Sequence, residues 1–553
     1  MNSVSLDNIS ALLDIIKPAI ASELITDTSF PLLDKASTEQ WIGSLSASSF
    51  ANNAIELYRI LPAATKLDID PNSKMDILDS LTPTVIRSTE CLMQSQLNQE
   101  TAKAISLGQA LIRQVYEGYK LVIYQLGKQP DITSQKNIAA LSQCILNACN
   151  VLAKIQLNSL SHYLQQPSYF WRELHALHLL AQQLNIADLD IPNPMGINTS
   201  ISKVYLKLLL FNCTRPNHFS NYELRFVYTE LDFWSSLAEL HRGTRGGLFA
   251  IDPSSNRGAV YADEIEPQPG NIILDTFNLV KFLNNIIVEN NDTLFSDRIS
   301  RRVIKDLVRQ WGEKIKRQET HIRDRAEVTI TRGFTSIICM LSRTDSFENF
   351  LLLCGQKPAA PDSAVSGIKR ADDVWGTSFE PIDSHPGDPV IYTPTRSNKT
   401  KLKLMRGIRN DISLNGACIE LVDNDNELQP GEPIAVRSKG SAKWVIGIIR
   451  WKHISPSLST VCGLQFPARN CTPAAIRGNP REDQAEPQFM QAIILAKKKD
   501  LSGDISLLCP PLRYTTGSKI YLLTPQRQTA AILGEEMETT EHLSHFKISF
   551  VNQ

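Results

Sequence analysis

The stretch that decides the fold begins Arg406-Gly-Ile-Arg-Asn-Asp-Ile-Ser-Leu-Asn-Gly416 and runs on through Ala417-Cys-Ile-Glu-Leu421. It ends with the segments Trp444-Val-Ile-Gly-Ile-Ile-Arg-Trp451 and Val461-Cys-Gly-Leu-Gln-Phe466. Apolar and polar residues alternate within each segment, and Gly, Asn and Pro separate the segments. Alternation with a period of two, interrupted by turn residues, predicts a run of short antiparallel strands.

The residues before this stretch have a helical pattern instead. From Phe50 to Leu240, apolar residues recur at intervals of two to four, for example over residues 102–126 and 138–164. Short polar joints containing Gly, Asp or Pro separate these segments. Helical segments of this length with short joints predict stacked helical hairpins, although no fixed repeat recurs. Because helices come first and strands later, we expect separate domains: a multidomain chain with a mostly α amino-terminal region and an all-β carboxy-terminal region.

Changes in composition predict five parts. We expect an α-helical domain at 1–240, a mixed α region with short strands at 241–354, and a Pro-rich linker at 355–395. The strands around the opening stretch occupy 396–475, and a second strand-rich domain occupies 486–553. The strand expected at Arg325–Gly333 falls within the mixed region.

The overall composition excludes several classes of protein. The formal net charge of −1 argues against a protein that coats nucleic acid. The sequence contains no run of about 18 apolar residues, so we expect no membrane span. The first residues lack the pattern of a signal peptide. The ten cysteines form no Cys-x-x-Cys pair, and several lie within apolar runs. That usage is typical of reduced thiols, so we expect a cytoplasmic protein.

Three other features have both a functional and an ordinary interpretation. His175 and His178 could form half of a metal site on one helix face, but no second pair accompanies them, so we expect ordinary helix histidines and no metal. The Gly-rich segment 243–247 could hold a phosphate or serve as a joint. The basic stretch 298–323 could contact RNA or form a solvated face.

No nucleophile elbow, zinc-protease motif or phosphate loop is present, so we predict no enzyme, no catalytic residue and no cofactor.

The opening stretch resembles the PilZ family. The resemblance rests on Asp411-x-Ser413-x-x-Gly416 and on the order of the elements that follow, including the Gly431-Glu-Pro turn and the segments ending at Trp451 and Phe466. It covers about 70 residues and implies a small six-stranded β-barrel within the carboxy-terminal region. A long helical region followed by such a barrel and a further strand-rich tail also looks like large bacterial PilZ-containing proteins.

The resemblance implies a ligand, the bacterial messenger cyclic di-GMP. In the family, the (Asp/Asn)-x-Ser-x-x-Gly motif contacts one guanine and its phosphate, which assigns this role to Asp411, Ser413 and Gly416. A carboxylate can accept two hydrogen bonds from a guanine edge, a hydroxyl can meet a phosphate oxygen, and a Gly with positive φ lets a flat base approach the backbone. These residue types are also common in β-turns, so a plain turn is the alternative.

The second family motif, Arg-x-x-x-Arg ahead of the barrel, has no match in the expected place. The nearest candidate is Arg396-Ser-Asn-Lys-Thr400, while Arg406 and Arg409 lie three apart on the strand that leads into the first motif. Lys cannot fully replace a guanidinium that stacks on guanine. The predicted cyclic di-GMP-binding residues are therefore Asp411, Ser413, Gly416, Arg406, Arg409, Arg396 and Arg450.

Two functions follow from these observations. The first is a bacterial cyclic di-GMP receptor or effector of the PilZ type, in which the helical region transmits nucleotide binding to a protein partner. The alternative is a protein-interaction scaffold whose PilZ-like barrel has lost nucleotide binding. Neither requires nucleic acid or a membrane span.

Overall fold

The computed structural model of the 553-residue chain describes residues 6–18, 24, 26, 30–45, 49–94, 99–192, 198–243, 246–289, 298–315, 320–356, 403–422, 428–478, 488–496, 505–511 and 514–551. The chain forms two compact units. The first, here called the helical unit, comprises Met1–Pro216, Asn221–Asp292 and Ile304–Lys316. The second, here called the barrel unit, consists mainly of Arg317–Gln553 and includes Asn217–Ser220 and Thr293–Val303.

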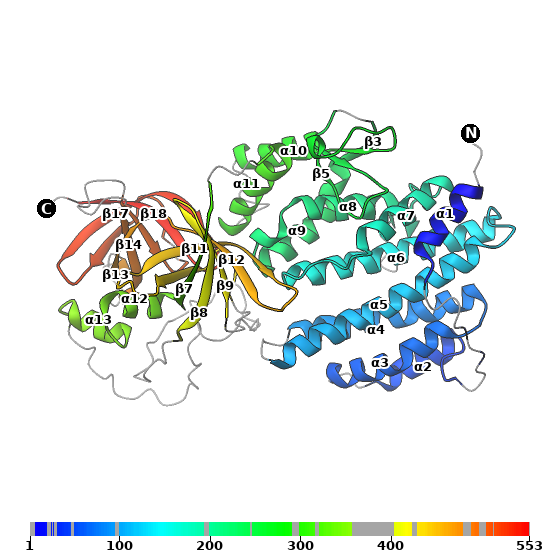
Figure 1. Cartoon of the computed structure of the whole chain (residues 1–553), viewed down its shortest axis with the longest axis horizontal. Coiled ribbons are helices and arrows are strands. Elements are labelled where there is room, and N and C mark those ends of the chain that lie inside the picture. Colours follow the sequence, from blue (N-terminus) through cyan, green and yellow to red (C-terminus); the bar gives the residue numbers. More distant parts are fainter. Residues whose placement is uncertain are drawn as a thin grey trace. The chain divides into compact units, whose positions relative to one another are not determined.

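The helical unit is built from long helices that pack against their neighbours in sequence (Figure 1). Its first helices are α1 (Leu6–Ile16), α2 (Lys35–Ser44), α3 (Phe50–Lys66), α4 (Pro71–Gln94), α5 (Gln99–Gly127), α6 (Gln135–Ser161), α7 (Phe170–Gln183), α8 (Ile201–Cys213) and α9 (Asn221–Trp234). The pairs α4–α5 and α5–α6 make extensive contacts, which is the packing expected of successive helical hairpins.

Helix α6 forms the centre of this unit. The Ser134 side chain accepts a hydrogen bond from the Asn137 amide and so caps the start of the helix. Many apolar residues of the helix itself are buried, including Leu141, Ile145 and Leu152. Among the described helices, α6 alone is long and apolar enough to span a membrane, but 61% of its most apolar window is buried inside the protein. Core helices have the same properties, so this is weak evidence for a membrane span.

A small sheet follows the helices. Its strands are β3 (Glu239–Arg242), β4 (Phe249–Ile251), β5 (Val260–Tyr261) and β6 (Ile272–Asp275), in the order β3-β6-β4-β5. A separate two-stranded ladder joins β1 (Ile191–Pro192) to β2 (Asn198–Thr199). The strand after the Gly-rich segment, β4, pairs with β5. The last helices before the barrels are α10 (Phe277–Glu289) and α11 (Arg298–Gly312).

The opening stretch of the sequence lies in a closed six-stranded barrel, as predicted. The strands follow one another around the barrel in the order β10-β11-β12-β9-β8-β7. Their bounds are β7 (Ile322–Arg332), β8 (Met405–Ile412), β9 (Gly416–Leu421), β10 (Pro433–Ser438), β11 (Val445–Ile454) and β12 (Thr460–Gln465). Inward-facing residues of every strand fill its core, among them Ile330, Ile419 and Ile449.

The first strand of this barrel corrects the expected boundary at residue 396. Strand β7 pairs with β8 on one side and with β10 on the other, so the barrel cannot close without it. The segment expected as a linker at 355–395 therefore comes between the first and second strands of one barrel, and residues 357–402 lie outside the described residues. Local periodicity predicted a strand at Arg325–Gly333, which overlaps β7, but periodicity carries no information about partners that are distant in sequence.

A second closed barrel completes the chain, with the order β13-β14-β15-β18-β17-β16. Its strands are β13 (Asn470–Gly478), β14 (Met490–Ala496), β15 (Ile505–Cys509), β16 (Lys519–Leu523), β17 (Gln528–Thr539) and β18 (Ser544–Phe550). Strand β13 lies across the boundary expected at residue 475, because it belongs to the second barrel from Asn470 to Gly478. Pro473 pairs with Ile493 of β14 and lies before the part of β13 that pairs with β16.

Two short helices, which follow β7 in the chain, pack against both barrels. They are α12 (Phe334–Ser342) and α13 (Phe347–Leu353). Ile337 and Phe350 share one hydrophobic cluster with Ile446 of the first barrel and with Ile493 and Leu508 of the second. Both barrels and these helices therefore form one continuous core. The predicted fold class, a mostly α amino-terminal region followed by an all-β carboxy-terminal region with a six-stranded barrel, is confirmed.

Candidate functional site

The Asp-x-Ser-x-x-Gly motif forms the hairpin between β8 and β9. The Ser413 amide donates to the Gly416 carbonyl at 2.8 Å, and the Phe466 amide donates to the Asn415 carbonyl at 2.7 Å. The first bond closes the turn, and the second attaches it to the end of β12. The motif is thus a β-turn on a rigid barrel, and its side chains project from a preorganised backbone.

Gly416 is required by its surroundings rather than by its backbone conformation. Its φ is not in the left-handed region, contrary to the sequence interpretation. A Cβ at this position would lie 2.6 Å from the carbonyl oxygen of Leu464 on β12. Only Gly lets β9 approach β12 so closely at the start of the hairpin.

A β-bulge decides which side chains of β8 face outward. Arg409 is opposite Ile419, which faces the barrel core, whereas Asp411 is opposite Cys418. The register shift between Arg409 and Asp411 leaves Asn410 as the extra residue. Since directly opposed residues lie on one face of a sheet, Asp411 is on the outer face of the barrel and Arg409 is on the inner side.

The two arginines of β8 are therefore separated. Arg409 donates to the carboxylate of Asp324 and, at 3.1 Å, to the Ser438 hydroxyl, so it ties β8 to β7 and to the end of β10. Arg406 is exposed and alternates with core-facing residues, so it lies on the outer face. Of the two, only Arg406 shares a face with Asp411.

Asp411 already has a partner. The Nδ1 atom of His321 lies 2.7 Å from Oδ1 of Asp411, and both side chains are about three-quarters buried. His321 immediately precedes β7, the true first strand of the barrel. The residue four positions before it is Arg317. Arg317 and His321 therefore have the spacing of the missing arginine motif at the entrance to the barrel; Arg317 itself lies outside the described residues. The sequence search missed this pair because it placed the barrel after residue 396.

An aromatic side chain belongs to the same outer face. Strand register aligns Asp411 of β8, Cys418 of β9, Gly463 of β12 and Trp451 of β11 in one row. A Cβ on Gly463 would lie 2.0 Å from the indole nitrogen of Trp451, so the indole lies directly against the backbone of β12. Sequence reasoning missed Trp451, because its position relative to Asp411 depends on strands paired through β9 and β12.

Arg450, one residue earlier, points elsewhere. Its Nε donates to Gln465 Oε1 at 2.6 Å, and its two terminal nitrogens donate to the carboxylate of Glu538 on β17 of the second barrel. Burial acts to raise the pKa of the Glu538 carboxyl, but the Arg450 guanidinium outweighs it, so the pKa is lowered. Arg450 thus links the two barrels. Arg396, the remaining predicted residue, lies outside the described residues.

The paired histidines of α7 have structural partners. His175 Nδ1 lies 2.7 Å from the Tyr205 hydroxyl, and His175 Nε2 lies 2.9 Å from the Arg257 carbonyl oxygen. The His178 ring stacks on Tyr205, with ring centroids 4.0 Å apart. No group of three or more His, Cys, Asp or Glu able to hold a metal occurs among the described residues. In the Gly-rich segment, Gly247 packs closely on Ile273 of β6, and residues 244 and 245 lie outside the description.

Comparison with known proteins matches the whole architecture. Three family models align in succession: "Cyclic-di-GMP receptor FimW, N-terminal domain" at residues 36–245, "Cyclic-di-GMP receptor FimW, middle PilZ domain" at 248–473, and "FimW C-terminal beta-barrel domain" at 475–551. The curated cyclic-di-GMP receptor FimW of Pseudomonas aeruginosa is 22% identical over 550 residues, which cover 92% of this chain and 89% of the relative. No solved structure matches. The middle match includes β7, in agreement with the pairing of β7 with β8 across the inserted segment.

Proposed function

From the premise that this chain belongs to the PilZ-domain family, we propose that it is a bacterial cyclic di-GMP receptor that works in the cytoplasm. The observation that carries the proposal is the outward-facing Asp-x-Ser-x-x-Gly hairpin on a closed six-stranded barrel. The name of the matching relative from Pseudomonas aeruginosa, a cyclic-di-GMP receptor, supports the same ligand. A receptor needs binding groups and no catalytic cluster, so we assign no enzymatic reaction.

The outer face supplies the chemistry that the ligand requires. Asp411 would accept hydrogen bonds from N1–H and N2–H₂ of one guanine, and Ser413 would donate to a phosphate oxygen. Arg406 lies on the same face and would neutralise phosphate charge. Trp451 offers an aromatic surface for the flat base.

Two residues before β7 would complete the site. We propose that Arg317 and His321 take the place of the two arginines of the family motif, in preference to Arg396. Binding would require His321 to release Asp411, since both would compete for the same carboxylate oxygens. Ligand binding would thereby reorganise the segment directly before β7, which connects the barrel to the helical region in the chain. We propose that this region carries the signal to a protein partner.

The alternative is an interaction scaffold that has lost nucleotide binding. It is favoured by the partners of the predicted arginines: Arg409 is held by Asp324, and Arg450 is held by Glu538. If these contacts persist, neither guanidinium reaches a ligand on the outer face.

Isothermal titration calorimetry with cyclic di-GMP separates the two functions. We expect binding by the full-length chain and at least about tenfold weaker binding by Asp411→Ala and by Ser413→Ala, because a charge-assisted hydrogen bond is lost in each. Glu327→Ala is the matched control, since Glu327 is an exposed carboxylate on the same barrel that pairs with Lys439. Absence of heat with well-folded protein would establish the scaffold instead. Unchanged affinity in Asp411→Ala would move the site away from the motif.

A further inference from the structure

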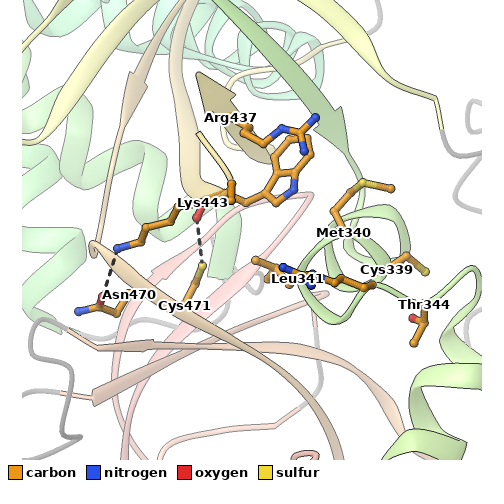
Figure 2. Close-up of a pocket in the computed structure, with 11 residues that line it drawn as sticks. Cys339, Met340, Leu341, Thr344, Arg437, Lys443, Asn470 and Cys471 are labelled. Carbon is orange, nitrogen blue, oxygen red and sulfur yellow. Dashed lines mark hydrogen bonds between the residues drawn. The ribbon is translucent and has the colours of Figure 1, made fainter. Parts of the chain in front are cut away.

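A cavity of about 570 Å³ lies away from the motif, where α12, the β10–β11 turn and the start of β13 meet (Figure 2). None of the residues that line it belongs to the Asp-x-Ser-x-x-Gly hairpin or to the row that contains Trp451. Its volume is within the range of small-molecule sites in proteins. The cavity therefore has the size for a ligand and no role in the site proposed above.

The charged lining of this cavity is all of one sign. Arg343, Arg437 and Lys443 line it, and no carboxylate does. Among the described residues, no ion pair is found for any of these three cations, and Lys443 Nζ donates to the amide oxygen of Asn470 at 3.3 Å. The nearby carboxylate of Asp345 lies outside the lining and accepts a hydrogen bond from Asn349. Three cations without a carboxylate partner favour a ligand with several negative charges.

One of these cations lies over an aromatic ring. The guanidinium carbon of Arg437 lies over the ring of Trp444, 4.7 Å from the ring centroid. Trp444 is only 7% exposed and belongs to the core shared by the two barrels, so the ring on which Arg437 lies is itself held in place. A guanidinium held in this way can stack on a second flat ring with its other face. Met340 and Leu341 add an apolar wall.

We propose that this cavity binds a nucleoside polyphosphate. The base stacks on the Arg437 guanidinium, and the phosphates are bound by Lys443 and Arg343. Because the cavity is formed by elements of both barrels and α12, a bound nucleotide stabilises their mutual packing. The proposal is independent of cyclic di-GMP binding on the outer face of β8 and β9.

Calorimetric titration of the full-length protein tests it, with cyclic di-GMP present at saturation so that the motif site is not available. ATP and GTP are compared with adenosine, which carries the base without the phosphates, and with inorganic tripolyphosphate, which carries the phosphate charge without a base. We expect a nucleoside triphosphate to bind more tightly than either half. No heat with ATP and GTP at millimolar concentration overturns the proposal, and so does tripolyphosphate binding as tightly as both nucleotides.

Substitutions locate the binding. We expect Lys443→Gln to weaken nucleotide binding roughly tenfold, because it removes one charge-assisted contact. Arg437→Lys keeps the charge and loses the flat surface, so it is expected to weaken ATP binding while leaving tripolyphosphate binding nearly unchanged. Lys439→Gln is the matched control, since Lys439 lies on the same turn outside the cavity and pairs with Glu327. Wild-type nucleotide affinity in both cavity variants refutes the proposed site; thermal unfolding and cyclic di-GMP titration report whether each variant is folded.

Discussion

The ion pair between Arg450 of the first barrel and Glu538 of the second predicts how strongly the barrels are coupled. Glu538→Gln removes the charge and keeps the shape of the side chain. The carboxylate side chain is 13% exposed and the guanidinium side chain is 32% exposed. Breaking a fully buried pair costs about 3–5 kcal/mol, and an exposed pair contributes less than about 1 kcal/mol. For this partly screened pair we expect the free energy of local opening to fall by about 1–3 kcal/mol.

Hydrogen–deuterium exchange of the full-length protein measures this opening directly. Peptides from β17 and β11 are expected to exchange roughly 5- to 150-fold faster in Glu538→Gln, since about 1.4 kcal/mol corresponds to a factor of ten. Glu535→Gln is the matched control, because Glu535 lies on the same strand and pairs with Lys547 at the surface. The reasoning is refuted if both variants change exchange equally, or if Arg450→Gln removes none of the effect of Glu538→Gln in a double-mutant cycle.

The same pair predicts a dependence on pH. Because the pKa of Glu538 is lower in the folded state than in the unfolded chain, its stabilising contribution is fully present above the ordinary pKa of a glutamate. The contribution is lost as pH falls through the folded-state value. The difference in thermal stability between wild type and Glu538→Gln should therefore be largest at neutral pH and disappear in acid. A difference that grows on acidification would contradict this assignment.

Three further outcomes follow from single residues. Gly416→Ala should destabilise the first barrel by about 1–3 kcal/mol in thermal unfolding, since its Cβ would lie 2.6 Å from the Leu464 carbonyl oxygen. An unchanged unfolding midpoint would show that the hairpin accommodates the added Cβ without loss of stability. Trp451→Leu should weaken cyclic di-GMP binding roughly tenfold in calorimetry, as expected for one stacked base, and equal affinity would remove the indole from the site. Burial lowers the pKa of His178 to about 3, so the folded state binds this proton less readily than the unfolded chain, and stability should decrease as pH falls below about 6.5. A His178→Gln variant should lose stability less steeply with acid than wild type does, and parallel curves would exclude this histidine as the cause.

The sequence was sufficient to predict the helical region and the strands, because the periods of 3.6 and 2 are local properties. It also located Asp411, Ser413 and Gly416 as candidate site residues, since their spacing lies within one hairpin. It could not predict that β7 closes the first barrel, because that strand's partners follow an inserted segment. The error had a consequence for the site. Because the barrel was expected to begin at residue 396, the arginine motif was expected near that residue and not ahead of β7, where Arg317 and His321 lie in the sequence.

The sequence by itself determined the composition of the motif hairpin and the order of a helical region followed by strand-rich regions. The tertiary structure decided what each side chain near the hairpin can reach. The bulge at Asn410 turns Asp411 outward and Arg409 inward, and pairing through β9 and β12 brings Trp451 into the row of Asp411. The second barrel supplies Glu538 to Arg450. The physical reason is that strand register and barrel closure are set by hydrogen bonds and packing between distant segments, and these contacts place each side chain on one face or the other.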